Sequence, residues 1–316
     1  MRVLVTGASG FAGSHLVELL AQAGDEVVAS DRAAPEGVPD GVESVALDVT
    51  DVDACWNLLT DARPGAIYHL AGQSHVARAE ADPAGCLAVN TGGTANVLQA
   101  CLDGHANVRV LVVSSAEVYG RVEADQLPVQ EDHPLRPATA YALSKAQAEM
   151  HVHRAVALGL HAVIARAFNH IGPRQSDDFV ASAFAHQVAR IEAGLQEPVL
   201  RVGNLEAVRD FSDVRDTVAA YRLCLAAGQP GDVFNVTSGE AVAVRQVLDR
   251  LVELARCEIA VEQDPSRMRP VDVPVFHGSP ERLHERTGFR PTHTVADCLA
   301  DVLDYWRASV ERRPER

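Results

Sequence analysis

The 316-residue sequence predicts an α/β protein, with a doubly wound parallel sheet covered by helices and a smaller C-terminal α/β lobe. Three observations support this fold class. A short apolar run leads through a glycine-rich turn into a helical pattern, apolar strands then alternate with helical stretches, and this rhythm breaks after residue 166. Alternating strands and helices are typical of a parallel sheet that is covered on both faces.

The first unit of this pattern is a strand, a turn and a helix at the N-terminus. Residues 2–6 are apolar, and Phe11 opens the helical pattern. The turn and the first helical residues contain Gly7, Gly10 and Gly13. In that order, such glycines permit a tight turn, an approach of the backbone to a pyrophosphate, and close packing of helix on strand. Because a helix N-terminus also offers unpaired N–H groups to phosphate, we expect a dinucleotide-binding Rossmann domain, with a plain glycine turn as the alternative.

Acidic residues follow the next two predicted strands. Strand 26–30 ends at Asp31, where a carboxylate can accept hydrogen bonds from both ribose hydroxyls of an adenosine and would repel a 2′-phosphate. This placement favours NADH over NADPH, although Arg32 could soften the preference by pairing with a phosphate. Asp48 follows a third short strand and suits the adenine end of the pocket, with a turn or N-cap role as an equal alternative.

The remaining elements follow in chain order. Further strands are predicted at 66–70, 109–114, 161–166 and 233–236, helices at 51–59, 84–101, 140–157, 180–193 and 295–308, and irregular structure at 169–179 and 265–291. We expect the Rossmann domain to comprise residues 1–168 and 211–238 and the ligand-binding lobe to comprise 169–210 and 239–316. The ligand is expected in the cleft between them.

Tyr141 and Lys145 are the candidate catalytic pair. They lie four residues apart in a predicted helix, so their side chains project from one face. A nearby ammonium favours the phenolate, and we expect it to lower the pKa of Tyr141 toward neutrality. Tyr141 could then exchange a proton with a carbonyl or an alcohol. Ser114 and Ser115 follow at the end of strand 109–114, where a hydroxyl can bind the reacting oxygen or be a satisfied strand-end group.

Composition narrows the class of protein. The formal net charge is −15 with a pI near 5.3, which argues against nucleic acid or an anionic membrane as a partner. The six cysteines are scattered without a Cys-x-x-Cys pair, so we expect neither disulfides nor a metal site. No apolar stretch reaches ~18 residues and no signal peptide precedes the first strand, so a cytoplasmic protein is expected.

Longer strings resemble one family. TGASGFAG, HLAG, SSAEVYG, YALSK and ARAFNHIGP resemble the extended short-chain dehydrogenases/reductases that act on nucleotide sugars, over nearly the whole chain. AGQSHV, FNHIGPRQ, VGNLEAVRDFSDVRD and MRPVDVP are similar to the GDP-mannose branch. The resemblance implies reduction of the C4 keto group of GDP-4-keto-6-deoxy-D-mannose to GDP-D-rhamnose with NAD(P)H. It also implies a homodimer formed through a four-helix interface.

The resemblance assigns roles to individual residues. Ser115, Tyr141 and Lys145 match the catalytic trio, and Lys145 would also hold the nicotinamide ribose. Cofactor contacts are implied for the residues already discussed, which are Gly7, Gly10, Gly13, Asp31, Arg32, Asp48, Tyr141 and Lys145. They are also implied for Phe11, Val49, Leu70, Ala71, Gly72, Asn90 and Phe168. Asn90 could also fix the backbone near the active site, and a structural role within its helix is an equal alternative. Substrate contacts are implied for Ser74, His75, Ser115, Asn169, Arg174, Val180, Arg209, Arg269 and Asp272.

Two of these arginines, Arg209 and Arg269, would pair with the diphosphate of the nucleotide, because a guanidinium matches phosphate geometry. A surface ion pair with Asp210 or Asp213 is the alternative for them. Asp272 stands where relatives have a glutamate, and it would bind the nucleotide ribose.

Other functions remain open at this point. A dehydratase or an epimerase of the same family is one alternative, and Glu117 could be the base that a dehydratase needs. Position 116 is an alanine, however, where dehydratases present a hydroxyl or a carboxyl group, and the chain lacks a segment that dehydratases carry before their Arg-Pro motif. A non-catalytic nucleotide-binding module is a further alternative, but such modules usually lose the Tyr–Lys pair.

Overall fold

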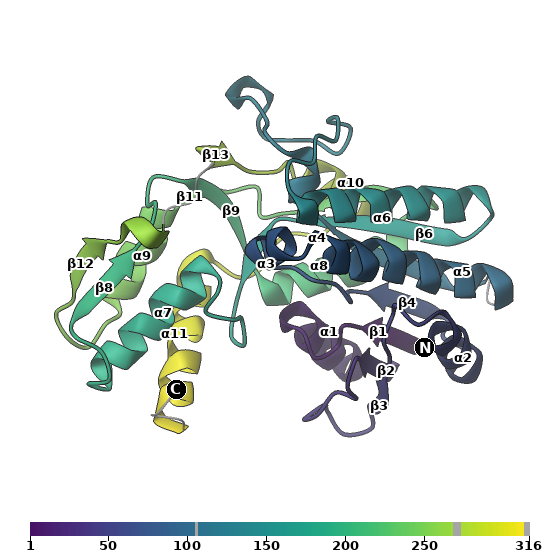
Figure 1. Cartoon of the computed structure of the whole chain (residues 1–316), viewed down its shortest axis with the longest axis horizontal. Coiled ribbons are helices and arrows are strands. Elements are labelled where there is room, and N and C mark those ends of the chain that lie inside the picture. The colour runs from purple at the N-terminus through teal and green to yellow at the C-terminus, as the bar shows by residue number, and fades with distance from the viewer. Residues whose placement is uncertain (105–106, 268–272, 313–316) are drawn as a thin grey trace.

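The computed structural model describes residues 1–104, 107–267 and 273–312. Its larger part is a seven-stranded parallel sheet in the order β10-β6-β5-β4-β1-β2-β3, with helices on both faces (Figure 1). The strands are β1 (Arg2–Thr6), β2 (Glu26–Asp31), β3 (Glu43–Ala46), β4 (Ala66–His69), β5 (Arg109–Ser115), β6 (His161–Ala167) and β10 (Val233–Val236). The predicted fold class is therefore confirmed.

Strand residues alternate between two apolar cores, which is the reason that both faces need helices. Val3 and Val5 of β1 face a core shared with α1 (Phe11–Gln22), α8 (Val214–Ala227) and α10 (Glu281–Thr287). Leu4 faces the opposite core, shared with α2 (Val52–Ala62), α5 (Thr94–Gly104) and α6 (Ala140–Ala157). The two short helices α3 (Val76–Ala81) and α4 (Pro83–Leu87) complete this side next to α6.

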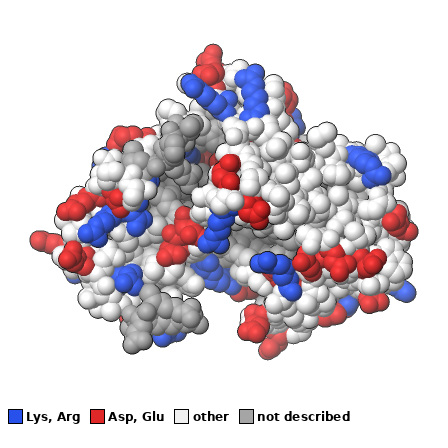
Figure 2. Space-filling model, viewed as in Figure 1, with Lys and Arg blue, Asp and Glu red and all other residues white. Residues whose placement is uncertain are grey.

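A smaller lobe with its own apolar core lies to the left in Figure 1. It contains β7 (Asn169–Ile171), α7 (Val180–Glu192), β8 (Val199–Val202), β9 (Val208–Asp213), β11 (Ala241–Ala243), α9 (Val244–Glu253), β12 (Ala260–Gln263), β13 (Val275–Phe276) and α11 (Val295–Arg312). A space-filling view shows a hollow between this lobe and the larger part, with charges of both signs around it (Figure 2).

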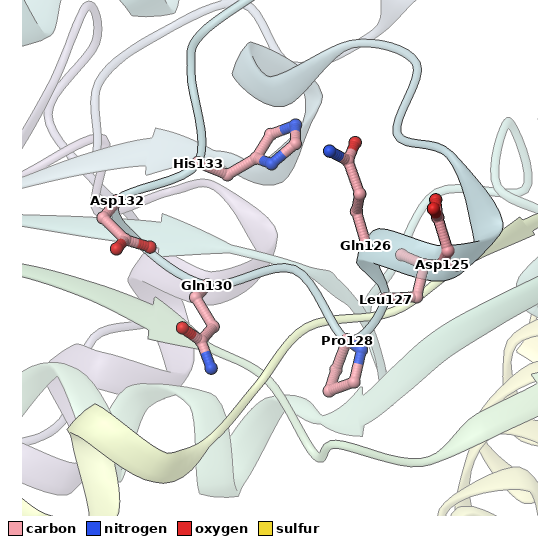
Figure 3. Close-up of a pocket in the computed structure, with 7 residues that line it drawn as sticks. All are labelled: Asp125, Gln126, Leu127, Pro128, Gln130, Asp132 and His133. Atoms are coloured by element: carbon pink, nitrogen blue, oxygen red, sulfur yellow. The ribbon is translucent and has the colours of Figure 1, made fainter.

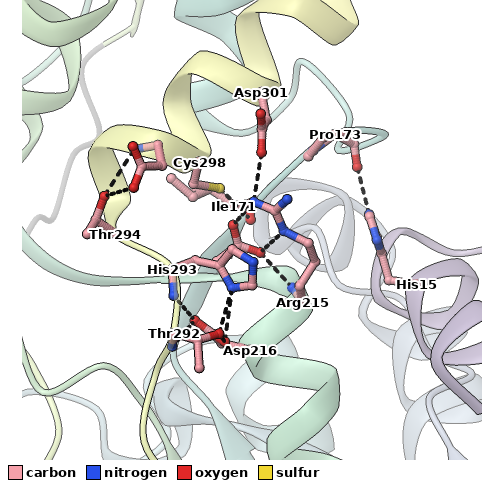
Figure 4. A network of polar contacts seen from close by, with 12 residues as sticks. His15, Ile171, Pro173, Arg215, Asp216, Thr292, His293, Thr294, Cys298 and Asp301 are labelled. Atoms are coloured by element: carbon pink, nitrogen blue, oxygen red, sulfur yellow. Dashed lines mark hydrogen bonds and ion pairs between the residues drawn. The ribbon is translucent and has the colours of Figure 1, made fainter. Parts of the chain in front are cut away.

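Polar contacts tie the lobe to the sheet (Figure 4). Arg215, at the start of α8, forms ion pairs with Asp213 at 2.6 Å and with Asp301 of α11 at 2.8 Å. Asp216 accepts hydrogen bonds from the Thr292 hydroxyl at 2.8 Å and from the His293 backbone at 2.9 Å. Helix α11 is therefore anchored to the helix that covers β10 and β6.

Several elements differ from the sequence prediction. Helix 140–157 and strands 2–6 and 233–236 are confirmed with the same bounds. The predicted helix 84–101 is three pieces, because the π-helix η1 (Ala88–Gly93) separates α4 from α5. The expectation of irregular structure was wrong for β7, β13 and α10, and the sequence analysis missed α8 and α9. The predicted division into 1–168 with 211–238 and 169–210 with 239–316 stays a proposal, but α10 packs against the core of the larger part and β9 belongs wholly to the lobe.

Candidate active site

The glycine-rich loop joins β1 to α1 at the carboxyl edge of the sheet. Gly7 has a φ of +73°, and a Cβ there would lie 2.6 Å from the Ala71 nitrogen, so the loop rests directly on the end of β4. A Cβ on Gly13 would lie 2.0 Å from the Gly7 oxygen. Gly10 is the N-cap of α1, and no side chain of the described residues caps this helix. The first N–H groups of α1 are therefore available to a phosphate, and the loop fits a dinucleotide.

Asp31 lies at the end of β2, next to this loop. Its carboxylate accepts hydrogen bonds from the Ser9 nitrogen at 3.1 Å and from the Arg32 nitrogen at 2.8 Å. Asp48 instead forms a turn, in which its Oδ1 accepts from the Thr50 nitrogen at 2.9 Å and from the Thr50 hydroxyl at 2.7 Å. Of the two roles left open for Asp48, the local turn is thus observed.

A cavity of about 530 Å³ adjoins the loop on the Asp31 side. It is lined by Ala8, Ser9, Gly10, Phe11, Ser14, Val17, Glu18, Ala33, Ala34, Pro35, Glu36, Gly37, Val38, Pro39 and Arg174. Arg174, a predicted substrate residue, forms an ion pair with Glu18 of α1 at 2.6 Å and contacts His15 Nδ1 at 2.7 Å. The structure therefore places Arg174 beside the cofactor loop.

Three predicted catalytic side chains meet between β5 and α6. Ser115, Tyr141 and Lys145 are 7 %, 8 % and 7 % exposed. Ser115 lies close enough to Tyr141 to act against the rise of its pKa. The Lys145 Nζ donates to the Val113 carbonyl at 2.8 Å, and it lies 3.4 Å from the position that a Cβ on Gly72 would take. The Tyr–Lys spacing therefore does bring both groups to the carboxyl ends of β4 and β5.

The expected lowering of the Tyr141 pKa is wrong for the protein alone. Burial raises the pKa of Tyr141 to about 12, against the interaction with Ser115, and the charge of Glu117 adds to the rise. Burial also lowers the pKa of Lys145 to about 8. Spacing along a helix cannot reveal desolvation, which penalises the charged form of both groups. The phenol is therefore protonated at neutral pH and ready to donate.

Asn90 fixes the backbone near the active site, the first of the two roles considered for it. From the π-helix, its Oδ1 accepts from the Gln73 nitrogen at 2.7 Å, and its Nδ2 donates to the Gln73 carbonyl at 3.0 Å and to the Ser144 hydroxyl at 2.8 Å. Ser144 in turn donates to the Tyr141 carbonyl at 2.7 Å. Asn90 thus fixes the segment after Gly72 to the catalytic helix. Sequence reasoning missed Ser144, although it stands inside YALSK.

The other predicted cofactor residues frame this centre with apolar atoms. Val49 is buried, and a Cβ on Gly93 would lie 2.5 Å from its Cγ2. The backbone of Leu70 and Ala71 lies directly against Gly7. Phe168 is buried and stacks on Phe276, with ring centroids 5.4 Å apart.

The predicted substrate residues lie on several segments of the cleft. His75 caps α3, and its ring lies 6.0 Å from the Phe179 ring, centroid to centroid. Ser74 and Asn169 are exposed, and Val180 begins α7. Arg269 and Asp272 lie outside the described residues. Contacts of all these residues with a substrate stay predictions.

The alternative for Arg209 was a surface ion pair with Asp210 or Asp213, and each of these acids has other partners. The Arg209 Nη1 donates to the Val208 carbonyl at 2.8 Å. Asp213 binds Arg215, and the buried Asp210 accepts from the Ser238 nitrogen and hydroxyl at 3.0 and 2.8 Å.

A further cavity of about 310 Å³ is formed by Asp125, Gln126, Leu127, Pro128, Gln130, Asp132 and His133 (Figure 3). It involves no predicted site residue. Within the described ranges, no group of three His, Cys, Asp or Glu side chains could hold a metal ion. None of the helices searched there is long and apolar enough to cross a membrane.

Comparisons with known proteins agree with the geometry. Residues 4–302 match the family model described as GDP-mannose 4,6 dehydratase. The chain is 38 % identical to GDP-6-deoxy-D-mannose reductase of Pseudomonas aeruginosa, over 98 % of each chain. It is 27 % identical to a GDP-mannose 4,6-dehydratase of Vibrio cholerae, over 96 % of this chain and 92 % of the relative.

Solved structures give the same result. The structure of RMD from Pseudomonas aeruginosa complexed with NADPH matches with a TM-score of 0.87 and 36 % identity, over 98 % of this chain and 100 % of that one. UDP-glucose 4-epimerase of Thermus thermophilus in complex with NAD matches with a TM-score of 0.87 and 32 % identity, over the same shares. The chain therefore belongs to the GDP-mannose 4,6-dehydratase family of extended short-chain dehydrogenases/reductases.

Proposed function

We propose that the protein reduces the C4 keto group of GDP-4-keto-6-deoxy-D-mannose to give GDP-D-rhamnose, with NAD(P)H as the reductant. The observation that carries this proposal is the meeting of the buried Ser115, Tyr141 and Lys145 side chains at the sheet edge that the glycine loop also occupies. The 38 % identity to a GDP-6-deoxy-D-mannose reductase supports the substrate.

The chain's own residues would stabilise the reaction at the ketone oxygen. When bound, the reduced nicotinamide supplies the hydride. Tyr141 donates its proton to the oxygen on which negative charge develops, and Ser115 donates a hydrogen bond to the same oxygen. Lys145 then stabilises the phenolate that remains, and it also holds the ribose of the cofactor. The phenol carries its proton at neutral pH before the reaction begins, and the positive charge of Lys145 would offset the burial that raises its pKa.

A dehydratase is the second candidate, since the family model and several relatives carry that name. Glu117 is exposed and its charge reaches Tyr141, so a base is present near the site. Ala116, however, is 4 % exposed and has no hydroxyl or carboxyl group to donate. We therefore place the reductase first.

We propose NADH as the preferred reductant, because the Asp31 carboxylate at the end of β2 would repel a 2′-phosphate. The substrate would be held by Ser74, His75, Asn169, Arg174, Val180, Arg209, Arg269 and Asp272. We also propose a cytoplasmic protein, in which the six free cysteines stay reduced.

A homodimer through α5 and α6 is a further part of this proposal. Leu143 and Met150 of α6 are 41 % and 69 % exposed, and their spacing of seven residues places them on one face. Light scattering should give the mass of a dimer, and Met150→Glu should give a monomer. A monomeric wild-type protein would contradict the proposed interface.

Two substrates separate the candidate functions. Purified protein is given GDP-4-keto-6-deoxymannose and, separately, GDP-mannose, while the absorbance of the reduced cofactor is followed. A reductase consumes reduced cofactor only with the keto sugar. A dehydratase consumes GDP-mannose without a net change in cofactor. Binding of cofactor without turnover of either sugar would favour a non-catalytic module.

A further inference from the structure

A buried ion pair lies behind Lys145, and the proposed mechanism does not use it. Glu149 stands one helical turn beyond Lys145 on α6, and it is 1 % exposed. Its Oε1 accepts hydrogen bonds from the Ser114 hydroxyl at 2.6 Å and from the Arg166 Nε at 2.9 Å. Its Oε2 accepts from the Arg166 Nη2 at 2.7 Å. Both carboxylate oxygens are thus held in a fixed direction.

The guanidinium of this pair is also fixed on its far side. The Arg166 Nη1 donates to the Tyr119 hydroxyl and to the Glu131 carbonyl, each at 2.9 Å. The Arg166 Cζ lies 4.8 Å from the centroid of the Tyr119 ring. The Tyr119 hydroxyl donates to the Asn235 Oδ1 at 2.6 Å. The network therefore runs from α6 through β6 to β10 without an open end at the ion pair.

Stability alone is a weak reason for such a pair. The desolvation of two buried charges roughly cancels their attraction, and an apolar pair of similar volume often stabilises a fold equally well. The position of the carboxylate suggests another role. Ser114, which donates to Glu149, lies between Val113, whose carbonyl accepts from Lys145, and the catalytic Ser115.

We propose that Glu149 is a positioning residue, whose carboxylate, clamped by Ser114 and Arg166, keeps the Lys145 ammonium charged and in place against β5. This inference rests on the proposed function, in which Lys145 serves both Tyr141 and the cofactor ribose. On this inference, the Glu149–Arg166 ion pair sets the charge and the position of Lys145 in addition to stabilising the fold.

The charges around Lys145 support this role. Burial lowers the pKa of Lys145 to about 8, whereas Cys86 of α4 and Glu149 act to raise it. His69 of β4 also faces the lysine, but burial lowers the pKa of His69 to about 3, so this ring is neutral near neutral pH. Removal of the Glu149 charge should therefore make Lys145 lose its proton at lower pH.

The test uses Glu149→Gln and two measurements across pH. One is the dissociation constant for NADH, followed by fluorescence, and the other is kcat/KM for the 4-keto sugar. We expect the alkaline decline of both to move to lower pH by roughly one unit, the lower end of what a close opposite charge does to a pKa. Ser114→Ala keeps both charges but removes one side of the clamp, so it should move the decline in the same direction by less than Glu149→Gln does.

The double variant Glu149→Gln/Arg166→Gln avoids leaving a buried arginine unpaired, and its fold is compared by circular dichroism and thermal melting. It should show a smaller shift in the same direction, because the nearby Arg166 charge, which disfavours the ammonium, is removed together with that of Glu149. A folded variant whose alkaline decline lies at the same pH as in the wild type would overturn the proposal. Unfolding of both variants would also overturn it, because the ion pair would then serve stability alone. If the wild type turns over no keto sugar, the proposed function fails, whereas the NADH profile still tests Glu149.

Discussion

Tyr141→Phe is the substitution that bears most directly on the mechanism, because it removes one hydroxyl and keeps the ring. The ring packs in a cluster with Ala79 and Cys86, and the side chain is 8 % exposed, so phenylalanine fills the same space. The structural loss is the interaction of the hydroxyl with Ser115, counted at most as one hydrogen bond. That loss should cost about 1 kcal/mol of stability, the usual net value of a neutral hydrogen bond.

The catalytic loss should be much larger. Removing a donor aimed at a developing oxyanion costs roughly 10²–10³ in rate. General acid catalysis contributes about 10²–10⁴. The two effects overlap because a single hydroxyl supplies both, so we expect kcat/KM to fall by roughly 10³–10⁴, which is about 4–5.5 kcal/mol of transition-state stabilisation.

The assay is the oxidation of NADH by GDP-4-keto-6-deoxymannose, together with the affinity for NADH and the melting temperature. Tyr221→Phe is the matched control, since Tyr221 is fully buried and its hydroxyl has no hydrogen-bond partner among the described residues. The control should keep its activity. A Tyr141→Phe protein with nearly wild-type kcat/KM would refute the assignment of the proton donor.

Three further results are expected. Gly13→Ala should lose most affinity for NADH, because the new Cβ would lie 2.0 Å from the Gly7 oxygen, and a titration with unchanged affinity would contradict the close loop. Asp31→Ala should lower the ratio of kcat/KM with NADH to kcat/KM with NADPH, and an unchanged ratio would show that Asp31 does not contact the ribose. Activity should decline above about pH 8 as Lys145 loses its charge. Since the pKa of Lys145 is lower in the folded state, its charged form destabilises the fold below about pH 8, and this cost disappears as the pH rises toward 10.5. Thermal melts should therefore show no loss of stability from Lys145 in the window where activity falls.

The sequence predicts the catalytic helix well because its signals are local. Thr139 caps α6 by accepting a hydrogen bond from the Ala142 nitrogen at 3.0 Å, and the helix then runs uninterrupted to Ala157. The preceding helix could not be predicted in the same way. Apolar spacing does not reveal that the turn around Asn90 is a π-helix, in which Asn90 contacts Gln73 and Ser144.

The chemistry of the site was predictable only in part. Spacing places Tyr141 and Lys145 on one face, but their pKa values depend on burial, which only the packed structure defines. Arg166 offered a signal that was not used, since an arginine near the end of an apolar strand needs a buried partner. That partner, Glu149, lies on the catalytic helix itself.

The most direct test of the central claim is the fate of a deuterium label carried by the reduced nicotinamide. GDP-4-keto-6-deoxymannose is incubated with labelled NADH, and the product is examined by NMR and mass spectrometry. Our account predicts GDP-D-rhamnose with deuterium at C4 from the wild type, at a rate that collapses in Tyr141→Phe. Product without deuterium at C4, or formation of the keto sugar from GDP-mannose by the same protein, would contradict it.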